Sequence, residues 1–256
     1  MLDALADPDK IVIAQTAPAV RTALGRDFGY EPGTLVTGKM VSALRRLGFD
    51  YVFDTDFAAD LTIMEEGSEF LERLKHKEDY QWPMFTSCCP GWVRFLKSQY
   101  PDMVDCLSTA KSPQQMQGAI IKNYFADKIH EDPENIFSVS IMPCIAKKAE
   151  CALPTMDSTG TGPDVDVVLN TREFVDYMKS LNIDVYGLPE DRFDSPCGEG
   201  TGLLPGRGCQ VRPGHPFRPE FQIQPRRAPY ARNGLRELPG RPLGGRMEGL
   251  GAVSYT

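Results

Sequence analysis

Short apolar runs alternate with amphipathic stretches along the first 202 residues. Four runs rich in β-branched or aromatic residues are predicted to be buried strands: IVIAQ (11–15), YVFDT (51–55), IFSVSIM (136–142) and DVDVVLN (164–170). Apolar residues at helical spacing predict helices in the segments between and after them: TAPAVRTALGRDFG, VTGKMVSALRRLGF, 59–75, SPQQMQGAIIKNYFADKI, 145–151 and TREFVDYMKSLN. This alternation predicts an α/β fold with parallel sheets flanked by helices. Ligands of such sheets bind where strands end and helices begin.

Two of the predicted helices begin at a proline, which is favoured at the first helical position. Pro113 follows Ser112, which we expect to cap its helix. Pro90 follows two adjacent cysteines, Cys88 and Cys89, in the segment TSCCPGW. We expect this segment to lie at a strand-to-helix junction.

Adjacent cysteines rarely form a disulfide with each other, and on an extended segment their side chains point to opposite sides. Cys89 precedes the helix start, where the helix dipole favours a thiolate and hence metal ligation. Cys88 is then free to present a protonatable thiol to a different cavity. The alternative is a pair of buried, apolar cysteines.

A second junction, MPCIAKKAE (142–150), carries Cys144, Lys147 and Glu150 at intervals of three residues. This spacing predicts that the three side chains share one face of the following helix. A thiolate, a cation and a carboxylate would then lie together, with Lys147 stabilising an anionic ligand near a metal. A core cysteine is the alternative for Cys144.

Composition limits the class of protein. The chain has 256 residues, 41% hydrophobic and 25% charged, which is typical of a soluble folded protein. A net charge of -7 argues against non-specific nucleic-acid binding. No run approaches the roughly 18 apolar residues of a membrane span, and the N-terminus lacks a signal-peptide pattern. We therefore expect a cytoplasmic protein whose seven cysteines are free thiols or metal ligands.

The sequence changes character near residue 202. Residues 203–256 contain nine Arg, nine Gly and eight Pro but no Lys or Asp. So much Pro and Gly interrupts any helical or strand period, and this predicts disorder. A frameshift or chimeric junction is one explanation, and a natural basic arm for an acidic partner is another. We accordingly divide the chain into 1–202 and a tail at 203–256.

The two cysteine motifs carry a family resemblance. TSCCPGW followed by MPCIAKKAE resembles the first two signature motifs of the catalytic domain of FeFe hydrogenases, the C-terminal domain of the large subunit. VTGKMVSALRRLGFD, DLTIMEEGSEF and LSTAKSPQQMQG extend the resemblance in family order, so that residues 10–200 are covered. The resemblance implies the N-terminal half of a two-lobed domain from an anaerobic oxidoreductase.

The resemblance also implies cofactors and partners. Family members bind a 4Fe-4S cluster through four cysteines, one of which joins it to a two-iron subcluster carrying CO, CN and a bridging dithiolate. That centre interconverts protons, electrons and H2. Ferredoxin or NAD(P)-linked electron-transfer subunits are the implied partners.

Site residues follow from the same resemblance. Cys89 and Cys144 match two ligands of the four-iron cluster, and Cys88 matches the thiol that relays a proton to the two-iron centre. The remaining matches form a proton path and a cofactor pocket: Glu66, Glu69, Ser108 and Arg73 for the path; Ala17, Pro18, Pro113, Gln114, Met142 and Lys147 for the pocket. Positions 66, 69 and 73 also share one helix face, although a solvated acidic face would have the same pattern.

The resemblance is incomplete. The family takes two further cluster cysteines from a later CxxxC motif, and no two cysteines here have that spacing. Cys106, Cys151, Cys197 and Cys209 match no ligand role. We therefore expect that this chain does not assemble the complete active site.

Two other functions compete with catalysis. One is a non-catalytic hydrogenase-like iron-sulfur protein for cluster assembly or H2 sensing. The other is a structural α/β module with incidental cysteines. A second thiol at Cys88 and the carboxylates Glu66 and Glu69 weigh against the iron-sulfur protein, because that function requires no proton delivery. The two complete cysteine motifs weigh against the structural module.

Overall fold

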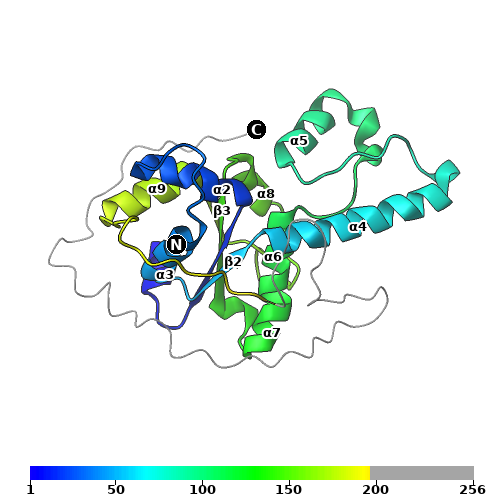
Figure 1. Cartoon of the computed structure of the whole chain (residues 1–256). Coiled ribbons are helices and arrows are strands. Elements are labelled where there is room, and N and C mark those ends of the chain that lie inside the picture. The colour runs from blue at the N-terminus through cyan, green and yellow to red at the C-terminus, as the bar shows by residue number, and fades with distance from the viewer. Residues whose placement is uncertain (197–256) are drawn as a thin grey trace.

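A computed structural model of the chain describes residues 1–196 and has a central sheet of four parallel strands (Figure 1). The strand order is β2–β1–β3–β4. The strands are β1 (Ile11–Thr16), β2 (Tyr51–Asp54), β3 (Ile136–Met142) and β4 (Val167–Asn170). The predicted parallel α/β sheet is confirmed. At the carboxyl edge, Thr16 pairs with Asp54 on one side and with Ile141 on the other.

Helices cover both faces of the sheet (Figure 1). One face packs against α1 (Leu2–Ala6), α2 (Pro18–Ala23), α3 (Thr37–Arg46) and α9 (Thr171–Ser180). The other packs against η4 (Ile121–Phe125) and α7 (Ala126–Ile129), which continue α6 (Pro113–Ile120). Successive side chains of β1 point to opposite faces of the sheet. Val12 and Ala14 belong to the core on the first of these faces, and Ile13 belongs to the core on the second.

A smaller unit projects from this body. The long helix α4 (Asp56–Lys75) starts beside the sheet and runs outward, and the chain then turns back to α5 (Pro90–Gln99); they are cyan and green in Figure 1. The helix α8 (Ala146–Cys151) follows β3 and lies near α5. Short helical turns complete the described elements: η1 (Leu24–Phe28), η2 (Lys77–Asp79), η3 (Pro101–Cys106) and η5 (Pro133–Asn135).

Three local predictions are wrong. The segment before α5 is not a strand of the sheet, since it makes only an isolated bridge between Phe85 and Leu107. Ser112 stands at the N-cap of α6, but its hydroxyl donates to the Glu150 carboxylate and accepts no hydrogen bond from the N–H groups of the helix. Cys144 precedes α8, which begins at Ala146, so it does not share a helix face with Lys147 and Glu150.

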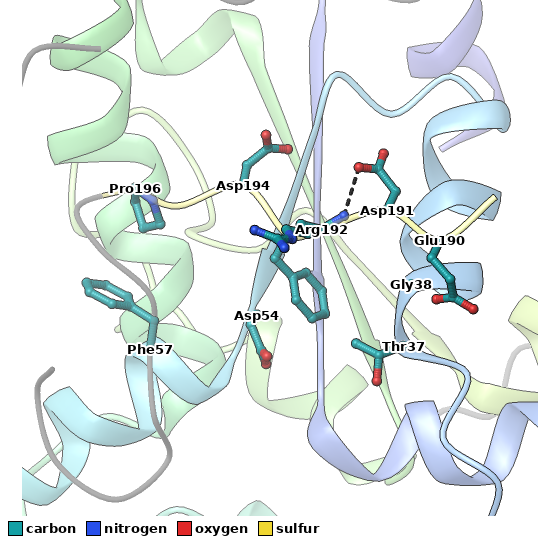
Figure 2. Close-up of a pocket in the computed structure, with 10 residues that line it drawn as sticks. Thr37, Gly38, Asp54, Phe57, Glu190, Asp191, Arg192, Asp194 and Pro196 are labelled. Atoms are coloured by element: carbon teal, nitrogen blue, oxygen red, sulfur yellow. Dashed lines mark hydrogen bonds between the residues drawn. The ribbon is translucent and has the colours of Figure 1, made fainter. Parts of the chain in front are cut away.

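The last described residues run along α3. The Lys39 ammonium donates to the carbonyls of Tyr186 and Leu188, and Arg45 pairs with Asp191. Figure 2 shows the pocket of about 560 Å³ that this segment forms with α3 and the end of β2. None of the site residues expected from the sequence lines this pocket.

Candidate functional site

The helix α4 brings three of the expected proton-path residues together. Glu69 Oε1 lies 2.7 Å from a guanidinium nitrogen of Arg73, one turn further along the helix. The Ser108 hydroxyl donates to Glu69 Oε2 at 2.6 Å, and the Thr109 N–H donates to the same oxygen at 3.1 Å. Arg73 is only 3% exposed and also donates to the carbonyl of Leu107. The acidic face is therefore an organised network and not merely a solvated surface.

Glu66 connects this network to the cysteine loop. Its Oε1 accepts the backbone N–H of Ser87 at 3.2 Å, and the Ser87 hydroxyl donates to the carbonyl of Ala110 at 2.9 Å. The N–H of Ala110 in turn donates to Ser108 Oγ at 3.1 Å. Hydrogen bonds on either side of the Ala110 backbone thus tie Glu69 and Ser108 to Ser87, the residue that precedes Cys88.

Electrostatics differ at the two ends of this series. Burial alone would raise the pKa of Glu69, but hydrogen bonds from Ser108, Arg73 and Thr109 together outweigh burial and lower that pKa. At the other end, partial burial raises the pKa of the Cys88 thiol, and the charge of Glu66 raises it further, against the opposing effect of Lys147. Glu69 is therefore held as a carboxylate while Cys88 is held as a neutral thiol.

The three motif cysteines lie on the surface. Cys88, Cys89 and Cys144 are exposed free thiols, so the alternative of buried, apolar cysteines is wrong for them. Cys89 is the N-cap of α5, and its sulfur accepts the N–H of Trp92 at 3.4 Å. A Cβ placed on Gly91 would touch both Cys89 Sγ and the Cβ of Ala146, so the starts of α5 and α8 face each other.

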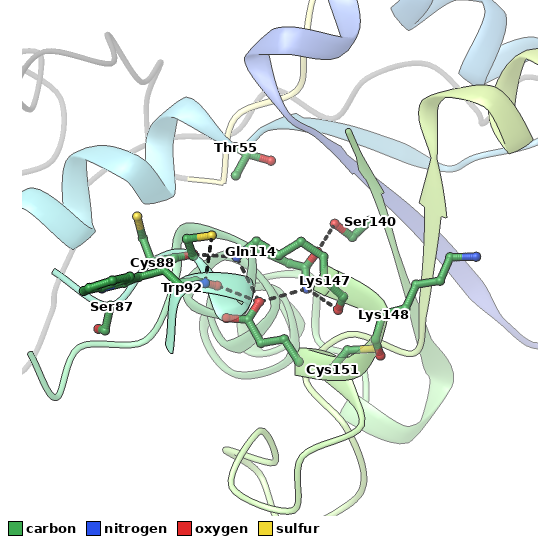
Figure 3. A network of polar contacts seen from close by, with 12 residues as sticks. Thr55, Ser87, Cys88, Trp92, Gln114, Ser140, Lys147, Lys148 and Cys151 are labelled. Carbon is green, nitrogen blue, oxygen red and sulfur yellow. Dashed lines mark hydrogen bonds and ion pairs between the residues drawn. The ribbon is translucent and has the colours of Figure 1, made fainter. Parts of the chain in front are cut away.

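Lys147 joins the two cysteine motifs. Its ammonium donates to the carbonyl of Cys88 at 2.8 Å and pairs with Glu150 Oε2 at 3.0 Å (Figure 3). The expected cation and carboxylate therefore do lie together, on α8, beside the loop that carries Cys88.

The expected pocket residues lie at the carboxyl ends of the strands and at helix starts. Met142 is buried at the end of β3. The residue before it, Ile141, accepts the N–H of Ala17 at its backbone carbonyl. Pro18 and Pro113 begin α2 and α6. These residues come from separate parts of the sequence to one edge of the sheet.

The side chain of Gln114 already makes hydrogen bonds within the protein. It is 1% exposed, and its side-chain carbonyl accepts the Ser140 hydroxyl at 2.9 Å. Its amide nitrogen donates to the carbonyl of Lys147 and to Glu150. Gln114 therefore ties α6 to β3 and α8.

Sequence reasoning missed several members of these networks: Gln15, Ser87, Ser112 and Ser140. A signal existed for two of them, since Gln15 and Ser140 are polar residues inside strands whose other residues are mostly apolar and buried. Buried polar groups require partners, so their presence indicates a network.

Among the described residues, the other two cysteines belong to no ligand set. Cys106 is buried, and the Cys151 thiol donates to the carbonyl of Lys148. Cys197, Cys209 and the tail at 203–256 lie outside the described residues.

The donors present fit only part of a four-iron cluster site. Such a cluster takes four thiolates, and the motif cysteines assigned to it here are Cys89 and Cys144. Within residues 1–196 no group of three or more His, Cys, Asp or Glu side chains is placed to hold a metal ion. The described donor set is therefore short of a complete cluster site. No helix in the same range is long and apolar enough to cross a membrane.

Comparison with known proteins gives a consistent family. Residues 10–210 match the model of the iron only hydrogenase large subunit, C-terminal domain. The chain is 61% identical to the NADP-reducing hydrogenase subunit HndD of Solidesulfovibrio fructosivorans, over 80% of this chain and 36% of that protein. It is 50% identical to the periplasmic Fe hydrogenase large subunit of Nitratidesulfovibrio vulgaris, over 74% of this chain and 45% of that protein.

A solved structure of an apo FeFe-hydrogenase from Chlamydomonas reinhardtii superposes with a TM-score of 0.72 at 44% identity, covering 79% of this chain and 53% of that one. Less similar relatives include the cytosolic iron-sulfur assembly component 3 of Bos taurus, 31% identical over 78% of this chain and 42% of that protein. The chain thus spans about a third to a half of the curated relatives it matches. With a family model matching most of its length, this chain belongs to the family defined by the C-terminal domain of the iron-only hydrogenase large subunit.

Proposed function

We propose that the chain is the proton-delivering part of an FeFe hydrogenase catalytic domain, which reversibly forms H2 from protons and electrons. The observation that carries this proposal is the placement of two carboxylates on α4: Glu69 accepts the Ser108 hydroxyl at 2.6 Å, and Glu66 accepts the N–H of Ser87, the residue before Cys88. Groups that exchange protons over such distances are suited to general acid-base work.

Each residue has a part in this proposal. Arg73 holds Glu69 in place from one turn along α4, and Glu69 exchanges a proton with the Ser108 hydroxyl across 2.6 Å. Glu66 stands beside the cysteine loop, and Cys88 is the last protein group, with its thiol exposed.

Cys89 and Cys144 are proposed to supply two thiolates of the 4Fe-4S cluster, with the remaining ligands coming from outside residues 1–196. The two-iron subcluster with its CO, CN and bridging dithiolate would supply the atoms at which hydrogen is made. Lys147 would face its anionic ligands, and Ala17, Pro18, Pro113 and Met142 would exclude water from it.

The proposed setting is an anaerobic cytoplasm, with ferredoxin or NAD(P)-linked subunits as electron carriers. The 61% identical relative from Solidesulfovibrio fructosivorans is named as a subunit of an NADP-reducing hydrogenase, which supports the NAD(P)-linked arrangement.

The test is H2 evolution by the native protein, purified without air together with any polypeptides that co-purify, using reduced methyl viologen as electron donor. Where a co-purifying polypeptide supplies the remaining cluster ligands, we expect activity in the wild-type assembly and a loss of about 100-fold or more in Glu69→Gln, because removal of a general acid-base group costs about 10²–10⁴-fold. Glu72→Gln is the matched control, since Glu72 lies on α4 but pairs with Lys75 and His76 on the surface.

The competing function is a non-catalytic iron-sulfur protein for cluster assembly or H2 sensing. The 31% identical assembly component from Bos taurus favours it. An assembly that carries the complete cofactor and yet evolves no H2 would support this alternative and refute the catalytic proposal.

A further inference from the structure

One buried carboxylate beside the cysteine motifs has no role in the function proposed above. Glu150, on α8, is 5% exposed. Its Oε2 accepts the Ser112 hydroxyl at 2.9 Å, the Lys147 ammonium at 3.0 Å and the Gln114 amide at 3.4 Å. A single oxygen thus collects donors from α6 and α8, in the network of Figure 3.

The same network reaches the sheet. Gln114, which donates to Glu150, accepts the hydroxyl of Ser140 in β3, and its backbone carbonyl accepts the side-chain amide of Gln15 in β1 at 3.0 Å. The Thr55 hydroxyl donates to Gln15 at 3.2 Å. Because Gln114, Gln15 and Ser140 are each at most 1% exposed, the network gives Glu150 a rigid support.

The same oxygen of Glu150 also binds a charged group. The Lys147 side chain is 12% exposed, and its ammonium contacts Glu150 and the carbonyl of Cys88. A mostly buried ammonium that loses its carboxylate is left uncompensated. Lys147 would then turn toward water and release the Cys88 carbonyl.

We infer that Glu150 is a positioning residue, which holds the Lys147 ammonium against the Cys88 carbonyl and thereby fixes the loop carrying Cys88 and Cys89 relative to α8. This inference rests on the proposed function, because a cluster bound by both Cys89 and Cys144 requires a fixed distance between the two cysteine motifs. Glu150 touches no reacting atom and acts through Lys147.

The experiment uses the metal-free full chain and two labelling probes, read by peptide mass spectrometry. Because the Cys88 thiol is already exposed, mobility of its loop is read from deuterium labelling of the backbone amides around Cys88, and an N-hydroxysuccinimide ester reports exposure of Lys147. In Glu150→Ala we expect several-fold faster labelling at both sites. Glu150→Gln, which keeps an acceptor but removes the charge, should lie between wild type and Glu150→Ala.

Controls separate positioning from unfolding. Lys148→Ala removes the neighbouring surface ion pair with Glu173 and should leave labelling around Cys88 unchanged. The buried Cys106 should stay protected from iodoacetamide in every variant that is folded. Should Glu150→Ala fail to fold, the double variant Glu150→Gln with Lys147→Met keeps the side-chain volume without a buried charge.

The effects of the two substitutions on labelling around Cys88 must also be non-additive. Lys147→Met alone should raise labelling around Cys88 as much as the double variant does, because both break one shared contact. The contrary result is that the amides around Cys88 are labelled at the wild-type rate in both Glu150→Ala and Lys147→Met while only the melting temperature falls. Glu150 would then have a merely structural role. That result would leave the hydrogenase proposal intact, because Glu69→Gln tests it through other residues.

Discussion

Glu69 illustrates how neighbouring donors fix the charge of a half-buried carboxylate. Burial works against its ionised form, yet Ser108, Arg73 and Thr109 together bring its pKa below the usual value. A carboxyl group with a lowered folded-state pKa stabilises the fold above its unfolded pKa, near 4.3, and this contribution is lost as the pH falls through the folded value.

The predicted consequence is a pH-dependent stability difference. At pH 7 we expect the free energy of unfolding of Glu69→Gln, measured with urea, to be lower than that of wild type by about 1.5–3 kcal/mol, the usual value of a hydrogen bond to a charged group. The difference should shrink as the pH falls below about 4.3, because the unfolded chain then binds a proton at Glu69 that the folded carboxylate does not, and it should vanish below the lowered folded-state pKa. A difference that stays constant from neutral to acid pH would contradict this explanation.

At the residue level, the sequence was enough to predict the candidate site residues but not the groups with which they form hydrogen bonds. Spacing alone placed Glu66, Glu69 and Arg73 on one helix face, and the structure has them there. It could not reveal that Ser87 binds Glu66 through its backbone, since backbone donors leave no trace in the choice of side chain.

Close packing between elements is visible at Gly118 in α6. A Cβ at this position would lie 2.6 Å from the carbonyl oxygen of Asp164 and 2.7 Å from a methyl of Val165. The absence of a side chain lets α6 approach the segment that leads into β4. Gly67, in α4, is the matched comparison, because a Cβ added there would meet no atom within 4 Å.

We predict opposite effects for alanine at these two glycines. Gly118→Ala should destabilise the protein by about 1–3 kcal/mol, because overpacking forces the backbone apart. Gly67→Ala should stabilise it by up to about 1 kcal/mol, because alanine favours the helix. Thermal unfolding measures both, and an unchanged melting temperature for Gly118→Ala would show that the contact relaxes freely.

Element prediction succeeded where one local pattern decided the outcome. The strand over 136–142 and the helix ending at 75 match their predicted limits because apolar periodicity is continuous there. Strand β4 begins only at Val167, since the side chains of Asp164 and Asp166 are engaged by Lys111 and Lys122. These long-range ion pairs cannot be read from local spacing.

The whole molecule combines two structural parts into one candidate site. The helix α4 carries the carboxylates outward from the body, whereas the sheet edge and α8 carry Met142, Lys147 and Cys144. The loop with Cys88 receives contacts from both parts, through Glu66 on Ser87 and through Lys147 on the Cys88 carbonyl. Proton delivery should therefore converge on Cys88.

The most direct test of this convergence compares wild type with Cys88→Ala in the native protein, purified without air and matched for iron content. The measurement is the initial rate of H2 evolution from reduced methyl viologen. We predict a loss of about 10²–10⁴-fold at unchanged iron content, as expected for removal of a general acid. A Cys88→Ala protein that evolves H2 at the wild-type rate would contradict proton delivery through this thiol.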